Sequence, residues 1–355
     1  MENRSKKNDY FKERNAKNQR QIMSNLSLLP YFCYEFIAGI ESKTTSLTRL
    51  NYTQDLKVFF QFLTTDCQNF VGIQIKDITL EDLAKLKVDD LELYLNYLTS
   101  YDKNDKNFQN SACSKARKLC AVRSLLKYFY NKDKLPENVS AKVDTPKIRE
   151  KEIIRLEVDE VVKLLDSVEN PNGFSKRQNS YNKLTKKRDV AILTLLLGTG
   201  IRVSECVGIN IDDIDFDTNS FKITRKGGNQ VVLYFSDEVA IALKDYLQDR
   251  LSNEEVDKNE NALFLSLQNK RIGVRAVEQL VKKYAKNCVP LKHITPHKLR
   301  STYGTNLYRA TGDIYIVADV LGHRDVNTTK KHYAAISEDA RRNVANILKL
   351  RDKED

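Results

Sequence analysis

A stretch of charged residues without periodic apolar positions divides this chain of 355 residues into two parts. The stretch begins where Pro136 ends a helical pattern, contains Pro146 and continues to about Glu152. Before it, apolar residues recur at three- and four-residue steps, as the buried face of a helix requires. After it, helical patterns alternate with short strand patterns. The sequence therefore predicts two domains joined by a linker over residues 139–152, and the length of the chain also favours two domains.

The part before the linker predicts a small helical domain over residues 26–138, with helical patterns throughout residues 48–130. Its helix faces consist of three groups of apolar residues: Tyr52, Leu56, Phe59, Phe60 and Leu63; Leu91, Leu95 and Leu98; and Ala116, Leu119, Val122, Leu126 and Phe129. Residues 1–25 are mostly charged or polar and rich in asparagine. We expect them to form a mobile, basic polar arm.

The chain carries an excess of positive charge. It has 59 Lys and Arg residues against 48 Asp and Glu residues, a formal net charge of +11. This excess is spread along most of the sequence and makes a polyanion the first partner to consider. Three cations, Lys115, Arg117 and Lys118, are expected to point away from the apolar face of their helix. On charge alone, an ordinary solvated surface is the more common meaning of such a run.

Composition and cysteine spacing exclude several classes of protein. No apolar run approaches the roughly 20 residues that cross a bilayer, and no secretory signal is visible. The six cysteines contain no C-x-x-C pair, and four of them lie in apolar, helix-like stretches. We therefore expect free, buried thiols in a reducing cytoplasm and no zinc site.

The first motif after the linker is G-T-G at residues 198–200, which follows an apolar run. It matches half of a dinucleotide-binding fingerprint, but Ser204 replaces the third glycine and Arg202 falls in the turn that must approach a pyrophosphate. We instead expect a helix that ends on Gly198 and a second helix capped at Ser204. Arg202 then projects from the loop between them, with Glu205 near enough to orient its guanidinium group.

Two other segments have clear local signals. Residues 170–187 are polar and basic and contain a proline and a glycine, which predicts a surface loop or insertion. The pattern predicts a hairpin with strands Ser220–Thr224 and Val231–Phe235. Its turn contains Lys226 and two glycines, which supply the positive φ angles that a tight turn needs.

His293 and His297 have the i,i+4 spacing of a helical metal-binding pair, but Pro296 prevents one helix from containing both. Thr295 is instead typical of an N-cap, with Pro296 at the first helical position. His297 then lies near the positive end of the helix, which favours a neutral imidazole, and Arg300 follows on the same face. This pair suits an anionic oxygen, although a capped surface helix explains the pattern equally well.

A third histidine follows a helix stop. An apolar helix ends at Gly322, a normal C-terminal glycine, and His323 comes directly behind it. Histidine in that place is often only a favourable cation at the negative end of a helix. A further short helix is expected to carry Tyr333, and lone tyrosines are usually half-buried packing residues.

Taken together, these weak signals form an ordered set that resembles the catalytic residues of the tyrosine recombinases, the phage integrase family: Arg202, Lys226, His297, Arg300, His323 and Tyr333. The strings GTGIRVSE, RKGG, TPHKLRSTYGTNLY and VLGHRDVNTTKKHYA carry the resemblance, which covers roughly residues 45–350 and is nearest to the bacterial Xer-type recombinases. The chain departs from the family pattern at Ser301, where histidine is frequent. It also has ten residues from His323 to Tyr333, one more than many Xer proteins.

The resemblance implies a mainly helical fold with a small β-sheet or hairpin, arranged as a two-domain, C-shaped clamp. A helical, SAM-like core-binding domain would precede an α+β catalytic domain over residues 153–355 that ends in a C-terminal helix. It also implies that Tyr333 attacks a DNA phosphodiester, giving a 3′-phosphotyrosyl link and a free 5′-hydroxyl. Strand exchange would then pass through a Holliday junction, with no metal, cofactor or ATP.

The resemblance assigns a role to each of the other residues. Arg202 and Arg300 would neutralise the charge on the non-bridging phosphate oxygens, and His323 would donate a further hydrogen bond to one of them. Lys226 would give a proton to the departing 5′-oxygen. His297 would act as general base or hydrogen-bonding partner for the tyrosine.

The implied partner is double-stranded DNA at a specific inverted-repeat site, with the chain a monomer or weak dimer when free and a homotetramer on DNA. The basic helix with Lys115, Arg117 and Lys118 would contact phosphates, and the C-terminal helix from Ser337 would dock on a neighbouring protomer. The expected location is the cytoplasm, at the nucleoid. Chromosome dimer resolution and mobile-element integration or excision both fit. A non-catalytic DNA-binding or bridging relative and a type IB topoisomerase-like relaxation activity stay open as alternatives.

Overall fold

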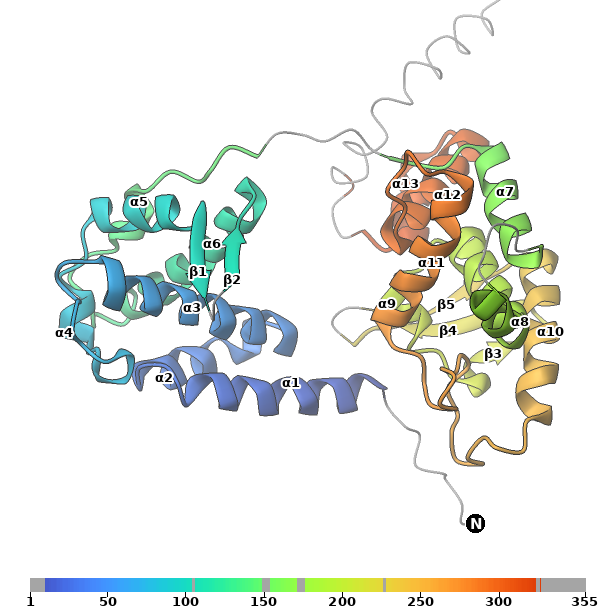
Figure 1. Cartoon of the computed structure of the whole chain (residues 1–355), viewed down its shortest axis with the longest axis horizontal. Helices are drawn as coiled ribbons and strands as arrows, with labels where there is room; N and C mark the ends of the chain where they lie inside the picture. The colour runs from blue at the N-terminus through green and yellow to red at the C-terminus, as the bar shows by residue number, and fades with distance from the viewer. Residues whose placement is uncertain are drawn as a thin grey trace, which may run out of the picture. The chain divides into compact units, whose positions relative to one another are not determined.

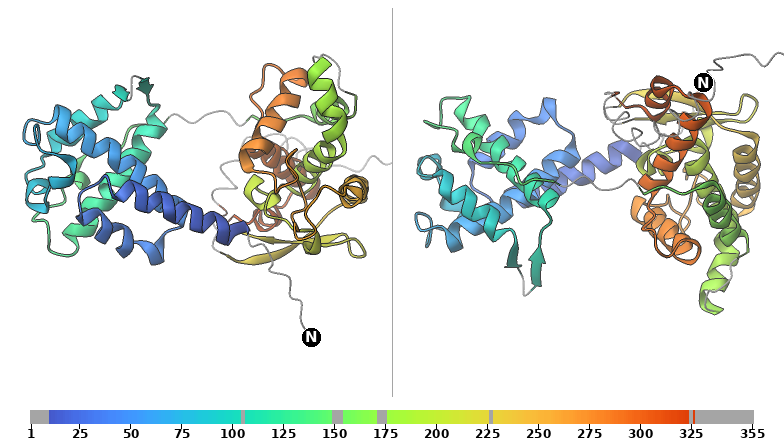
Figure 2. Two further views of the ribbon diagram at one scale, coloured as in Figure 1. Left: turned by 60° about the horizontal axis from the view of Figure 1, so that its bottom comes forward. Right: turned by 90° about the horizontal axis from the view of Figure 1, so that it is seen from above.

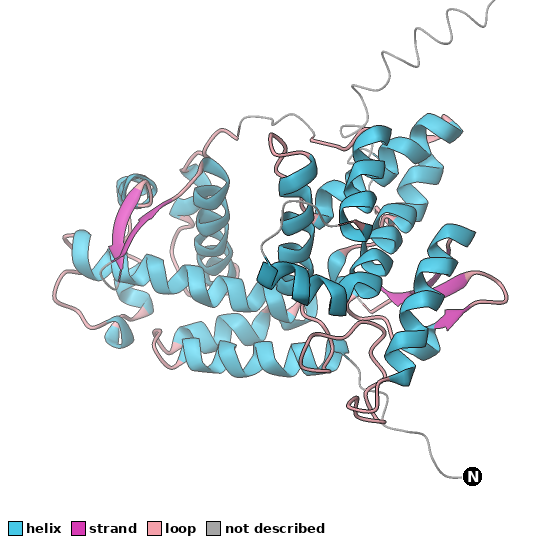
Figure 3. Cartoon of the chain, turned by 45° about the vertical axis from the view of Figure 1, so that its right-hand side comes forward, coloured by secondary structure: helices cyan, strands magenta, loops and turns pink. Residues whose placement is uncertain are grey.

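The computed structural model describes residues 10–103, 106–148, 154–170, 176–225, 228–323 and 326. The chain divides into two compact units that meet in sequence at residues 151 and 152, and each is described by itself. Both are mostly helical with small antiparallel sheets (Figures 1 and 3), so the predicted mainly helical, two-domain fold with a small β-sheet is confirmed. In the part of the chain that is described, none of the helices combines the length and the apolar character needed to cross a membrane.

The N-terminal unit is a helical bundle with one short hairpin. Its elements are α1 (Tyr10–Leu26), α2 (Phe32–Gly39), η1 (Glu41–Lys43), α3 (Ser46–Asp66), η2 (Ile75–Asp77), α4 (Leu80–Leu83), α5 (Val88–Tyr97), β1 (Ser100–Lys103), β2 (Lys106–Gln109), α6 (Ala112–Tyr130) and η3 (Val139–Lys142). The long helices α3 and α6 pack together, and Phe59, Leu63, Leu119 and Val122 are completely buried between the elements. The unit is therefore held together mainly by the burial of aliphatic and aromatic side chains.

Helix α1 corrects the expectation of a mobile polar arm from Tyr10 onward. It packs on α3, with Ile22 and Leu26 buried and the Asn18 amide donating to Ser46 Oγ at 3.0 Å. The buried face of α1 thus begins with a polar residue, and only two apolar residues continue it. A search for apolar periodicity does not detect a helix whose contact face is so short.

The hairpin β1–β2 corrects the expectation of helices throughout residues 48–130. Its strands pair antiparallel, with Tyr101 opposite Phe108. The Tyr101 ring stacks on Tyr97 on one side and Phe108 on the other, with ring centroids 5.1 and 5.6 Å apart. Each strand has four residues, too few for an alternating pattern to stand out in the sequence.

The residues after α6 belong to the N-terminal unit for longer than expected. Val143 is buried, and the Arg123 guanidinium group donates to Ser140 O at 3.2 Å and to Thr145 Oγ1 at 2.6 Å. The first residues of the predicted linker over 139–152 are therefore fixed to this unit.

The second unit places helices around a three-stranded antiparallel sheet, β3–β4–β5 (Figure 2). Its elements are α7 (Val158–Glu169), α8 (Lys176–Thr199), α9 (Val203–Cys206), η4 (Ile211–Asp213), β3 (Ile214–Asp215), β4 (Ser220–Thr224), β5 (Gln230–Tyr234), α10 (Asp237–Ser252), α11 (Val274–Cys288), α12 (Pro296–Thr311) and α13 (Ile314–Leu321). The predicted hairpin is confirmed as β4–β5, with the second strand one residue earlier than expected.

Helix α8 is central to this unit, because it packs against α7, α10 and α12. It begins at Lys176, so the prediction of a loop over residues 170–187 is wrong for most of that range. Within residues 181–189 of this helix the buried side chains are Asn182, Thr185 and Asp189, which recur at helical spacing but are polar. A pattern that counts only apolar residues therefore misses the helix until the run that follows Asp189.

Candidate active site

The C-terminal end of α13 brings together three of the predicted catalytic residues from separate segments. Arg202 Nη2 donates to Gly322 O at 3.3 Å, and Arg300 Nη2 donates to Leu321 O. His323 follows directly, with its backbone N–H bound to Ala318 O in the helix cap. The last carbonyls of a helix lack partners within the helix and form its negative end, so they attract guanidinium groups.

Arg202 is held on its other side by Glu205. It occupies the N-cap position of the short helix α9, and the Glu205 carboxylate accepts from its backbone N–H at 2.8 Å and from Nη1 at 2.9 Å. Glu205 is buried, so this ion pair is sheltered from solvent. The expectation that Glu205 orients the guanidinium group is confirmed. The expected cap at Ser204 is wrong, because the cap is Arg202 itself.

Helix α8 ends at Thr199, one residue after the predicted end on Gly198, and a turn then leads to Arg202. Gly200 has φ +62°, and Thr199 is the last helical residue, so the predicted end on Gly198 is wrong. A Cβ on Gly200 would lie 2.3 Å from Tyr303 Cδ1. Both the backbone conformation and the close approach of α12 therefore require glycine here.

Arg300 lies on α12 and is 5% exposed. Its Nη1 donates to Gly200 O at 2.6 Å, in addition to the bond to Leu321 O. A buried permanent charge needs polar partners, and here backbone carbonyls from the ends of α8 and α13 supply them. Arg300 thus ties together the two turns that carry Arg202 and His323.

His297 lies where the sequence predicts, in the first turn of α12. The helix starts at Pro296 with Thr295 as its N-cap residue, and His297 is exposed. No cluster of three or more His, Cys, Asp or Glu side chains that suits a metal ion occurs among the described residues. Within α12, Arg300 is buried, whereas His297 lies three residues earlier and is exposed at the start of the helix.

The other two predicted catalytic residues, Lys226 and Tyr333, fall outside the described residues. The hairpin can be followed to Arg225, whose backbone N–H donates to Asn229 O at 2.8 Å. Its guanidinium group reaches α13, where Nη2 donates to Val320 O at 2.8 Å. Sequence reasoning did not single out Arg225, although it stands directly before Lys226 in the RKGG string.

The sequence matches the family model described as "Phage integrase family" over residues 154–339. A tyrosine recombinase XerC of Caldanaerobacter subterraneus subsp. tengcongensis is 35% identical over 288 residues, 79% of this chain and 75% of the relative. A tyrosine recombinase XerS of Streptococcus thermophilus is 33% identical over 347 residues, 91% of this chain and 96% of the relative.

The chain belongs to the phage integrase family. It is a Xer-like tyrosine recombinase, an enzyme of site-specific DNA recombination, and DNA is its partner. Solved structures show the same fold. XerH bound to palindromic difH substrate, a post-cleavage complex, has a TM-score of 0.63 at 17% identity, over 97% of this chain and 91% of that chain. A lambda integrase tetramer bound to a Holliday junction has a TM-score of 0.59 at 15% identity, over 85% and 76%.

The cations proposed to contact DNA in the N-terminal unit of this recombinase are engaged by other side chains of that unit. Lys115 Nζ donates to Thr99 Oγ1 at 2.6 Å, and Arg117 is exposed but pairs with Asp55. Lys118 is 8% exposed and lies 3.5 Å from the same carboxylate, so the expectation that it points to solvent is wrong. The buried Asp55 explains this, because it needs cations beside it.

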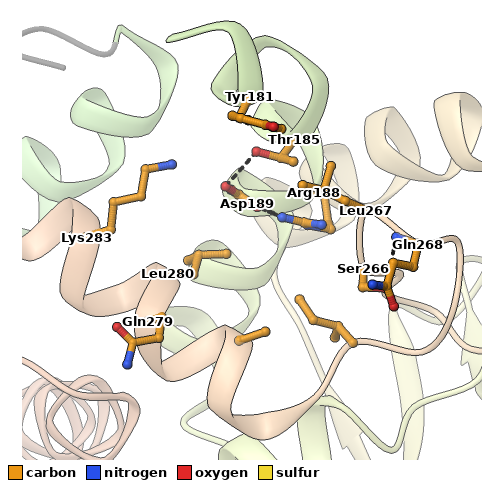
Figure 4. Close-up of a pocket in the computed structure, with 12 residues that line it drawn as sticks. Tyr181, Thr185, Arg188, Asp189, Ser266, Leu267, Gln268, Gln279, Leu280 and Lys283 are labelled. Atoms are coloured by element: carbon orange, nitrogen blue, oxygen red, sulfur yellow. Dashed lines mark hydrogen bonds and ion pairs between the residues drawn. The ribbon is translucent and has the colours of Figure 1, made fainter. Parts of the chain in front are cut away.

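An open cavity of about 640 Å³ between α8, α11 and the loop at residues 266–268 contains none of the predicted catalytic residues. Figure 4 shows Asp189 at its wall, bound to Thr185 and Arg188 of its own helix. The Tyr284 hydroxyl also donates to Asp189, and burial with this carboxylate raises the pKa of Tyr284. These polar contacts help to hold α8 against α11.

The six cysteines of the recombinase are free thiols, as expected. Cys33, Cys67 and Cys206 are buried, and burial raises the pKa of Cys206 to about 12. Cys113 and Cys120 are exposed, so the expectation of burial is wrong for these two. They lie on outward-facing positions of α6.

Proposed function

We propose that this recombinase cleaves DNA by attack of the Tyr333 hydroxyl on the scissile phosphorus and exchanges strands through a Holliday junction. The observation that carries the proposal is the convergence of Arg202, Arg300 and His323 at the end of α13. Two planar, permanently charged guanidinium groups beside one imidazole form a site for the non-bridging oxygens of a phosphodiester.

The chemistry follows from the charge that develops during phosphoryl transfer. The tyrosine oxygen forms a bond to phosphorus while the bond to the 5′-oxygen breaks, and negative charge remains on the non-bridging oxygens. Arg202 and Arg300 neutralise that charge, and His323 donates to one oxygen. The 3′-phosphotyrosyl link conserves the energy of the phosphodiester, so attack by a 5′-hydroxyl rejoins the strand without ATP.

Proton transfer is assigned to the remaining two residues. Lys226 gives its proton to the departing 5′-oxygen, which is a poor leaving group as an alkoxide. His297 accepts or shares the proton of the tyrosine hydroxyl. Its exposed place in the first turn of α12 supports this role, because it leaves the imidazole accessible to a substrate.

The proposed substrate is an inverted-repeat site in duplex DNA, bound by four copies of the chain. Lys115 and Arg117 are the proposed phosphate contacts in the N-terminal unit. The C-terminal helix from Ser337 is proposed to dock on the next protomer, and the proposed place of action is the nucleoid in the cytoplasm. The relatives named XerC and XerS support this proposal through their similarity over most of the chain.

The test is covalent capture on a nicked suicide substrate, in which the cleaved strand loses the fragment needed for rejoining. We expect a protein–DNA adduct that survives denaturing electrophoresis, and we expect Tyr333→Phe to lose it completely. Tyr315→Phe is the matched control, because Tyr315 is an exposed tyrosine at the start of α13. DNA binding without any adduct would indicate a non-catalytic relative, and relaxation of supercoiled DNA without a defined site would indicate a topoisomerase.

A further inference from the structure

Arg225 links the lysine-bearing hairpin to the end of α13. It is the last described residue before the turn, and its guanidinium group donates to Val320 O at 2.8 Å and, more weakly, to Asp319 O at 3.4 Å. These carbonyls belong to the last turn of the helix that presents His323. The negative end of α13 therefore holds three guanidinium groups, those of Arg202, Arg225 and Arg300.

The contact between Arg225 and the cap of α13 is closely fitted. Gly322 ends the helix with φ +63°, and a Cβ on it would lie 2.2 Å from Arg225 Nη1 and 2.4 Å from Cζ. The guanidinium group thus occupies the space that any other residue at 322 would fill. Arg202 donates to Gly322 O from the same cap, so the two arginines share one turn of backbone.

The partners of Arg225 are backbone carbonyls. No ion pair to a carboxylate is found for it within the described part of the chain, whereas Arg202 is paired with Glu205. Its Nε is buried and has no hydrogen-bond acceptor among the described residues. Among the described residues, the side chain is therefore placed by the shape of the α13 cap and by the helix end.

The strand end at Arg225 is held by backbone hydrogen bonds as well as by its side chain, because the Gly228 N–H donates to Arg225 O at 3.0 Å. The strands pair up to Thr224 and Gln230, and the Arg225 N–H bond to Asn229 O is the next cross-strand contact. Two glycines follow Lys226 in the turn, and Gly228 has φ +89°. Lys226 follows Arg225 directly in the sequence, so the anchor at Arg225 constrains the backbone from which the Lys226 side chain extends.

We propose that Arg225 is a positioning residue for the cleavage reaction. By tying the strand end to the last turn of α13, it sets the place from which Lys226 reaches the leaving 5′-oxygen, relative to His323 and the two phosphate-binding arginines. This inference rests on the proposed function. A general acid must lie within hydrogen-bond reach of the atom that it protonates, and a misplacement of about 1 Å costs on the order of a hundredfold in rate.

The test compares two leaving groups in single-turnover cleavage by the full-length protein at saturating DNA. One suicide substrate has the ordinary 5′-oxygen, and the other has sulfur at that bridging position, which leaves as a thiolate without needing a proton. We expect Arg225→Ala to cleave the oxygen substrate about 30- to 300-fold more slowly than the unaltered protein. On the sulfur substrate we expect a difference of less than about threefold, the same pattern as for Lys226→Ala.

A second variant and a control separate positioning from folding. Arg225→Lys keeps the charge but loses the planar fork, so we expect an intermediate rate on the oxygen substrate and full rescue by sulfur. Arg250→Gln is the control, because Arg250 also donates to a backbone carbonyl, Ala262 O at 3.0 Å, on another side of the unit. It should lower the midpoint of thermal unfolding and affect both substrates equally.

Each other outcome overturns a specific statement. If Lys226→Ala is rescued by sulfur but Arg225→Ala is not, Arg225 acts on the phosphate itself and the positioning role is wrong. If Arg225→Ala cleaves the oxygen substrate at the rate of the unaltered protein, the anchor is irrelevant to Lys226. If Tyr333→Phe still forms the adduct, Tyr333 is not the nucleophile of the proposed function. If Lys226→Ala is not rescued by sulfur, Lys226 is not the proton donor.

Discussion

The apolar core of the N-terminal unit and the end of α13 in the second unit are packed in different ways. In the N-terminal unit the helices meet through completely buried rings and aliphatic chains, such as Phe59 and Leu119. At the end of α13 the apolar cluster is small, with Val317 and Leu321 buried, and guanidinium groups bound to carbonyls complete the packing. Apolar burial gives stability without direction, whereas hydrogen bonds fix charged groups in place. The comparison teaches that apolar packing stabilises the fold, whereas the contacts at the end of α13 place charge.

The largest effect that would break this comparison is expected at Arg300. Arg300→Gln removes the charge that joins the turns of α8 and α13, so we expect single-turnover cleavage to fall by about a thousandfold or more. Arg300→Lys keeps the charge without the fork and is expected to recover only part of the rate. The measurement is adduct formation at saturating DNA, with thermal unfolding in parallel. If either variant cleaves at the rate of the unaltered protein, the charge of Arg300 at this helix end is not needed for cleavage.

For Phe59→Ala we expect the opposite result, a large loss of stability with little change in the cleavage rate. The ring is completely buried and lies 5.1 Å from that of Tyr94, so its removal should cost the N-terminal unit about 3–5 kcal/mol. We expect calorimetry to show a lower unfolding midpoint and cleavage at saturating DNA to change little while the unit stays folded. Phe108→Ala is the control on a half-exposed ring and should cost much less. Equal losses in the two variants would contradict the apolar account of this unit.

A smaller loss of cleavage rate is expected for Glu205→Gln, which tests how far a buried partner of Arg202 contributes to the placement of charge. The amide keeps the shape of the side chain but weakens the hold on Arg202 Nη1, so we expect cleavage to slow by about tenfold to a hundredfold. Glu157→Gln serves as the control, since Glu157 pairs with Arg309 at 3.1 Å near the surface. Rates of the two variants on one suicide substrate give the comparison. If both change equally, burial of the Glu205 pair has no particular importance.

The smallest effect is expected for Glu35, whose carboxylate accepts from Lys134 and Lys132. These hydrogen bonds lower the pKa of Glu35 below its usual 4.5. A lowered pKa in the folded state means that the pair stabilises the protein above that usual value and that the gain is lost as the pH falls through the lowered pKa. In denaturant unfolding, Glu35→Gln should lose at most about 1 kcal/mol at pH 7. The difference should shrink in 1 M salt, and one that grows on acidification would contradict the assignment.

Local signals predicted the elements that present the site. Thr295 and Pro296 mark the start of α12, and Gly322 marks the end of α13, because caps depend on a few neighbouring residues. Periodicity failed where the inward face is polar, at Asn18 in α1 and at Asn182 in α8. Those positions are decided by partners far along the chain, which no local window contains.

The sequence predicted which residues belong to the site only through their joint resemblance to a family, and not through their spacing. Arg202 and Gly322 are 120 positions apart, and no spacing rule brings them together. The resemblance to a family named Arg202, Arg300 and His323, but it gave no reason for their arrangement. That reason is a set of backbone carbonyls at one helix end, which sequence patterns do not encode. Arg225 was missed for the same reason.

The carbonyls at the end of α13 have a consequence for turnover. Arg202 and Arg300 make hydrogen bonds to Gly322 O and Leu321 O within the protein itself. An incoming phosphate oxygen therefore shares or exchanges donors that are in use, and its net gain per contact is smaller than for a bare guanidinium group. Such a site binds the phosphate tightly enough for reaction but still releases it. This suits the proposed reaction, in which cleavage and rejoining must proceed equally well.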